Sequence, residues 1–128
     1  MPKKKSLYQE HPDYRVDLEP SDAHVCLRLG DEVIAESTKT LLVRETRLEP
    51  VVYFPKADVR FDRLEKTAHE TFCPFKGDAS YWTVRAGGLV EENAVWGYED
   101  PFEEVAGLKD YVSFYSYRFS SSGGESAE

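Results

Sequence analysis

The sequence has few cysteines and no long apolar segment. Cys26 and Cys73 are its only cysteines. A secreted domain of this size is usually held together by several disulfides, so we expect both thiols to be free in a reducing cytoplasm. No stretch approaches the roughly 20 apolar residues that span a bilayer, and no apolar signal segment follows the lysines at 3–5. These absences predict a cytoplasmic protein with no membrane partner.

The sequence also lacks positive charge. Its formal net charge is −8 and its pI is about 4.9. Non-specific binding to a phosphate backbone depends on clustered Lys and Arg side chains that release counterions. The basic run at residues 3–5 is too short to supply such a cluster. We therefore expect no nucleic-acid partner.

Motifs for metals and phosphates are missing as well. A zinc site needs about four ligands, with its cysteines in close pairs, and this chain has no such pair. Its histidines are scattered along the chain. Gly87 and Gly88 are adjacent but lack the spacing of a phosphate-binding loop, and no GxSxG sequence is present. We expect no metal and no bound cofactor.

The residues that are present predict one β domain. The chain of 128 residues is 41% hydrophobic and 13% aromatic, which is enough to form one core. Period-2 alternation of apolar residues indicates strands. We predict a flexible leader at 1–13, a single β domain at 14–119 and a disordered Ser/Gly tail at 120–128. The predicted strands are 14–18, 25–29, 32–36, 38–45, 80–85, 94–98 and 111–119.

The connections between these strands are predicted from prolines and glycines. Pro50 and Pro55 indicate a loop after the fourth strand. Residues 56–59 can begin a short helical turn, and the stretch that follows, up to residue 69, fits either a short helix or an edge strand. The pair of glycines at 87–88 predicts a hairpin turn. The connection at 102–109 has room for one helical turn.

The segment Cys73-Pro74-Phe75-Lys76-Gly77 is a candidate for thiol chemistry. A nearby ammonium favours the thiolate, which is the form that attacks electrophiles. The alternative is that Cys73 is a small buried hydrophobe and Lys76 a solvated loop charge. The residues alone leave both interpretations open.

Aromatic residues are the second candidate feature. Trp82 and Trp96 lie on strands that we expect to pair, and side chains that face the same way could line a pocket for a small ligand. Most of the neighbouring aromatics are expected in the core. Glu45 ends the fourth predicted strand, where its carboxylate can point into a site or into water.

Several segments, taken in order, resemble a bacterial domain-of-unknown-function family, number 427. The resemblance runs from about residue 14 to residue 117. The family is also filed under a nucleotidyltransferase-type label, which no motif here supports. The segments are Glu45-Thr46, Tyr53-Phe54-Pro55, Asp58-Val59, Cys73-Pro74-Phe75-Lys76-Gly77, Ser80-Tyr81-Trp82 and Asn93-Ala94-Val95-Trp96-Gly97-Tyr98.

This resemblance implies a mostly β, β-tent or Mss4-like fold. Two small antiparallel sheets would pack at an angle, with one or two short helical turns and without the zinc of relatives that have paired cysteines. Relatives of that fold include B-type methionine sulfoxide reductases and the aromatic-cage domain of cereblon, so thiol chemistry and small-ligand capture both have precedent by analogy. The family pattern implies a site made of Glu45, Tyr53, Cys73, Lys76, Trp82, Trp96 and Tyr98.

The sequence leaves three functions open. In the first, the aromatic residues of the site bind a small planar ligand of unknown class, while Glu45 and Lys76 fix its polar edge. In the second, the chain is an enzyme: Cys73 is a nucleophile or redox thiol, Lys76 favours its thiolate, Glu45 moves protons and Cys26 resolves. In the third, it is an interaction module, monomeric or homodimeric, whose aromatic C-terminal strand pairs at an exposed edge.

Overall fold

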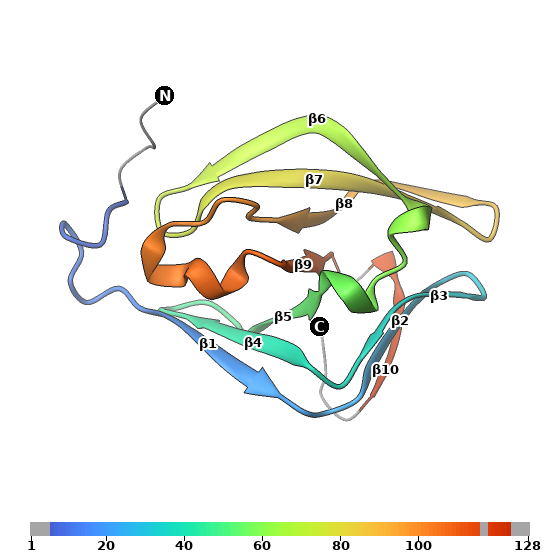
Figure 1. The fold of residues 1–128 in the computed structure, drawn as a ribbon, viewed down its shortest axis with the longest axis horizontal. Coiled ribbons are helices and arrows are strands. Elements are labelled where there is room, and N and C mark those ends of the chain that lie inside the picture. The colour runs from blue at the N-terminus through green and yellow to red at the C-terminus, as the bar shows by residue number, and fades with distance from the viewer. Residues whose placement is uncertain (1–5, 116–117, 124–128) are drawn as a thin grey trace.

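The computed structural model describes residues 6–115 and 118–123, and it is built from two antiparallel sheets (Figure 1). The mostly β, two-sheet prediction is confirmed. The three-stranded sheet has the order β10 (Ser120–Gly123), β2 (Val25–Leu29) and β3 (Glu32–Ser37). The seven-stranded sheet has the order β1 (Val16–Ser21), β4 (Thr40–Glu45), β5 (Val51–Pro55), β9 (Tyr111–Phe114), β8 (Leu89–Gly97), β7 (Gly77–Ala86) and β6 (Leu64–Cys73).

Short 3₁₀ helices fill the connections. The predicted turn after Pro55 is η1 (Lys56–Asp58), and the ambiguous stretch resolves into η2 (Phe61–Arg63) followed by the edge strand β6. The third, η3 (Glu103–Leu108), lies between the two arms of the curved seven-stranded sheet (Figure 1). Among the described residues, no helix has the length and the apolar character required to cross a membrane.

The seven-stranded sheet has a core on each face. Residues directly opposite one another on antiparallel strands point to the same face, whereas successive residues alternate. The inter-sheet core packs β2 and β3 against this sheet, and the second core packs its other face against η3. The large buried side chains of the inter-sheet core include Leu27, Ile34, Phe54, Trp82 and Val95, and those of the second core include Leu41, Tyr53, Tyr81, Tyr98, Phe102 and Leu108.

The predicted proline loop is wrong. Residues 51–55 form β5, which pairs with β4 on one side and with β9 on the other. Pro50 precedes the strand and Pro55 ends it, so the missing N–H groups lie at its limits and the ladder between them is intact. Strand β9 ends at Phe114, earlier than predicted, and residues 116–117 lie outside the described residues. Because β9 lies between β5 and β8, it offers no exposed edge to a partner.

The two predicted ends also differ from the structure. Residues 120–123 form β10 and pair with β2, so they are not a disordered tail; residues 124–128 lie outside the described part. Backbone pairing with a formed strand here overrides the weak β propensity of Ser and Gly. In the leader, Leu7 N donates to Pro74 O at 3.1 Å, and the Tyr8 hydroxyl donates to Phe75 O at 2.6 Å. Residues 1–5 are not described.

Candidate functional site

A small cavity on the second-core face gathers most of the predicted site residues. Its volume is about 180 Å³. Strands β4, β5 and β8 and the turn between β6 and β7 contribute its walls. The lining residues are Val43, Glu45, Leu48, Glu49, Val51, Tyr53, Lys76, Trp96 and Tyr98.

A buried ion pair lies in this lining. Lys76 Nζ contacts Glu45 Oε1, and each side chain is only 9% exposed. The same Lys76 Nζ lies 3.8 Å from Cys73 Sγ and 6.0 Å from the centre of the Tyr98 ring. The predicted convergence of Glu45, Lys76 and Cys73 is therefore present in the structure, although Cys73 does not line the cavity.

The β6–β7 turn directs Lys76 inward. Its backbone closes through a hydrogen bond from Lys76 N to Cys73 O at 3.2 Å. Gly77 follows with φ +119, and a Cβ there would meet Asp100 O at 3.4 Å. Phe102 N donates to Lys76 O at 3.0 Å. Glycine at 77 thus allows the turn to pack closely against residues 100–102, and this packing holds Lys76 over the second core.

Aromatic side chains form the rest of the wall. Trp96 Nε1 donates to the Tyr53 hydroxyl at 3.2 Å, and the two rings meet edge to face with centroids 6.2 Å apart. Burial raises the pKa of the Tyr53 and Tyr98 phenols above the usual value. Both phenols are therefore neutral hydrogen-bonding groups at neutral pH. Within the described part of the chain, the Tyr98 hydroxyl has no hydrogen-bond partner.

The prediction that Trp82 and Trp96 face the same way is wrong. In the β7–β8 register, Trp82 pairs with Val95, and Tyr81 pairs with Trp96, so the two tryptophans point to opposite faces. Trp82 is 5% exposed in the inter-sheet core, where its ring meets that of Phe61 at 5.8 Å. It cannot line the same cavity as Trp96.

The two cysteines do not come together. Cys73 ends β6 and is partly buried against the second core, whereas Cys26 is 3% exposed on β2 in the other sheet. Both are free thiols, and the β6–β7 turn and β2 lie at opposite ends of the molecule in Figure 1. The structure therefore gives Cys73 no resolving partner in Cys26.

Tyr14 is a site residue that sequence reasoning missed. Its hydroxyl donates to Glu45 Oε2, and its ring stacks on Phe75 with centroids 3.8 Å apart. In the β1–β4 register Val16 pairs with Glu45, so a side chain two residues before Val16 reaches the same face near Glu45. Only that register, which the sequence does not reveal, could have identified it.

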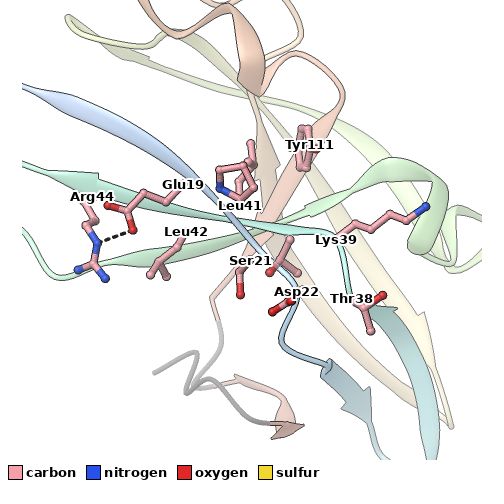
Figure 2. Close-up of a pocket in the computed structure, with 11 residues that line it drawn as sticks. Glu19, Ser21, Asp22, Thr38, Lys39, Leu41, Leu42, Arg44 and Tyr111 are labelled. Carbon is pink, nitrogen blue, oxygen red and sulfur yellow. Dashed lines mark hydrogen bonds and ion pairs between the residues drawn. The ribbon is translucent and has the colours of Figure 1, made fainter.

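A wider surface hollow, of about 750 Å³, lies beside β1 and β4 (Figure 2). None of the predicted site residues lines it. Two of its charged groups pair with one another, since Arg44 Nε donates to Glu19 Oε1 at 2.9 Å (Figure 2). Among the described residues, no group of three or more His, Cys, Asp or Glu side chains could hold a metal ion.

Comparison with known proteins identifies a family. No curated protein matches the chain significantly. The family model described as a domain of unknown function, DUF427, matches residues 17–122. That span contains every residue of the small cavity but excludes Tyr14. Because the match covers most of the chain, the protein belongs to the DUF427 family, as the resemblance implied.

Proposed function

We propose that the cavity of about 180 Å³ binds a small, uncharged, planar molecule. The aromatic rings of Tyr53, Trp96 and Tyr98 supply faces and edges against which a flat ring can pack. Val43 and Val51 add apolar surface. A few polar groups within a mainly apolar lining are typical of small-molecule sites.

The buried pair of Glu45 and Lys76 carries this proposal. Removing two charges from water costs free energy that their attraction often fails to offset, so a buried pair is weak support for a purely stabilising role. Beside a cavity, the carboxylate can accept a hydrogen bond from a ligand and the ammonium can donate one. The two buried charges balance, and the third charged group of the lining, Glu49, is exposed to water. The complementary ligand is therefore neutral and presents a donor close to an acceptor.

The size of the cavity narrows the ligand class further. Sites for drug-sized ligands enclose about 300–1,000 Å³. A cavity of about 180 Å³ accommodates a single ring. The expected ligands are therefore pyrimidine bases, cyclic imides and cyclic ureides, and a whole nucleotide is too large. The Tyr98 hydroxyl, which has no hydrogen-bond partner among the described residues, offers one further donor to such a ring.

A thermal-shift panel tests this proposal. The purified protein would be melted with nucleobases, cyclic imides, ureides, nucleotides plus Mg²⁺, and methionine sulfoxide, since a ligand that binds only the folded state raises the melting temperature. We expect a rise with a one-ring compound, lost in Trp96→Ala and kept in Cys73→Ser. The control is Phe72→Ala, because Phe72 is 39% exposed and outside the cavity. An unchanged rise in Trp96→Ala, or no rise with any compound, contradicts the proposal.

A second candidate function is thiol chemistry at Cys73, and one distance favours it. Lys76 Nζ lies 3.8 Å from Cys73 Sγ, within reach of a thiolate at that position, although the same ammonium also contacts Glu45 Oε1. On this candidate, iodoacetamide alkylates Cys73 at pH 7 faster than it alkylates a free cysteine peptide, and Lys76→Met removes the difference. Equal rates for protein and peptide eliminate it. The β-tent assignment, which provides the analogy to thiol reductases, likewise stays a prediction.

A further inference from the structure

We propose that Tyr14 is a positioning residue of the small cavity, which fixes the Glu45 carboxylate in the orientation that meets Lys76. Tyr14 does not line the cavity itself and acts through Glu45. The inference rests on the proposed function in one respect only, namely which ligand the positioned Glu45 carboxylate binds.

Glu45 is held from two sides. Its Oε1 accepts from Lys76 Nζ, and its Oε2 accepts from the Tyr14 hydroxyl. A carboxylate with a donor on each oxygen cannot turn about its terminal bond without losing one of them. Burial raises the pKa of the Tyr14 phenol, and the hydrogen bond to Glu45 raises it further. The hydroxyl therefore keeps its proton and remains a donor at neutral pH.

The position of the Tyr14 hydroxyl is itself fixed by packing. The Tyr14 ring lies nearly parallel to that of Phe75, with an interplanar angle of 11° and centroids 3.8 Å apart. On the strand side, Arg15 N donates to Thr46 Oγ1 at 2.8 Å and Thr46 N donates to Arg15 O at 3.0 Å. These contacts tie residues 14–15 to the end of β4 and hold the Tyr14 ring against Phe75.

The same contacts attach the N-terminal segment to the turn that carries Lys76. Tyr8 and His11 place their rings on Phe75, at centroid distances of 5.1 Å and 6.1 Å. Tyr8 also donates from its hydroxyl to Phe75 O. The described N-terminal residues, although outside the family match at 17–122, therefore complete the surroundings of Glu45 and Lys76.

Hydrogen exchange of the Lys76 ammonium tests the inference without any ligand. In ¹⁵N-labelled protein, a buried ammonium bonded to a fixed carboxylate exchanges its protons with water more slowly than an exposed lysine does. Tyr14→Phe keeps the ring on Phe75 and removes only the hydroxyl. Loss of a hydrogen bond to a charged group should accelerate exchange at Lys76 about tenfold. The matched control is Tyr111→Phe, which removes the hydroxyl of a tyrosine that lines the wider hollow and not the small cavity, and which should leave exchange unchanged.

A second measurement tests the hydrogen bond between Tyr14 and Glu45 at its Tyr14 end. In Glu45→Gln, the ¹³Cζ chemical shift of the Tyr14 ring at pH 7 should change, because the hydroxyl loses its charged acceptor. If the exchange rate of the Lys76 ammonium in Tyr14→Phe stays within twofold of the rates in wild type and in Tyr111→Phe, the inference is overturned. An unchanged Tyr14 ¹³Cζ shift in Glu45→Gln overturns it as well. Neither measurement involves a ligand. A thermal-shift panel in which no compound raises the melting temperature would therefore contradict the proposed function without affecting this inference.

Discussion

Replacing Glu45 by glutamine should destabilise the protein strongly. The change keeps the shape of the side chain but leaves the Lys76 ammonium, which is 9% exposed, without an opposite charge. Breaking a buried ion pair by removing one partner costs about 3–5 kcal/mol, because the remaining charge stays buried and unpaired. A value of about 3 kcal/mol is expected here, since the small exposed fraction lets water reach the ammonium.

The reasoning predicts recovery in a double variant. Lys76→Met in the Glu45→Gln background removes the unpaired charge and fills the space with an apolar chain of similar length. The free energy of unfolding should return to within about 1 kcal/mol of wild type, since neutral replacements of a buried pair are often tolerated. Ligand binding should not return, because the carboxylate and the ammonium proposed to bind the ligand are both lost. Stability and binding would then separate in one protein.

Urea unfolding at pH 7 measures these differences, and an exposed ion pair provides the control. Glu19 and Arg44 are 2.9 Å apart with side chains 50% and 51% exposed, so Glu19→Gln should cost at most about 1 kcal/mol. Glu45→Gln should in addition lower the melting temperature by about 10 °C, given roughly 3–5 °C per kcal/mol for a domain of this size. Equal costs for Glu45→Gln and Glu19→Gln would refute the reasoning, since the buried pair would then behave as a solvated one.

Two further predictions follow from burial. The raised pKa values of Tyr53 and Tyr98 mean that the folded state keeps protons that the unfolded state releases above about pH 10. Their contribution to the free energy of unfolding should therefore be constant below that pH and be lost above it. Urea unfolding at pH 8 and pH 11 checks this, and equal values contradict it. Each single-tryptophan variant allows the fluorescence of the remaining tryptophan to be measured. Acrylamide should quench Trp96, in Trp82→Phe, more than it quenches Trp82, in Trp96→Phe, because Trp82 is 5% exposed and Trp96 is partly exposed. Equal quenching would refute the opposite-face arrangement.

Strand positions were predictable from sequence where apolar residues alternate on one chain segment. The runs at 25–29 and 80–85 satisfy that condition, and both are strands in the structure. Prediction failed where pairing decided the outcome. Residues 51–55 carry prolines at their limits and residues 120–123 are Ser and Gly, yet both segments are strands because a neighbouring strand supplies the hydrogen bonds. Local propensity contains no information about that neighbour.

The sequence identified five of the residues that line the cavity but not the geometry that brings them together, and the two tryptophans show why. A one-residue change of register moves every side chain of a strand to the other face. The β7–β8 ladder shifts between Trp82 and Val84, where Asn93 has a positive φ, and the register on the Trp96 side of that irregularity sets which residue opposes Trp96. Alternation along each strand alone cannot reveal this. The resemblance named Trp82 as a site residue, and the register places it in the other core.

The same dependence on register explains how Tyr14 and Lys76 meet at Glu45 from distant parts of the chain. The β1–β4 ladder brings Tyr14 to the end of β4, and the turn after β6 brings Lys76 to the same carboxylate. Strand β1 lies at one edge of the seven-stranded sheet and β6 at the other. The two residues come together because the sheet curves around the second core (Figure 1). A variant that loosens either arm should therefore disturb the Glu45 carboxylate before it unfolds the protein. For this reason, the exchange rate of the Lys76 ammonium is a more sensitive measure of the site than the melting temperature.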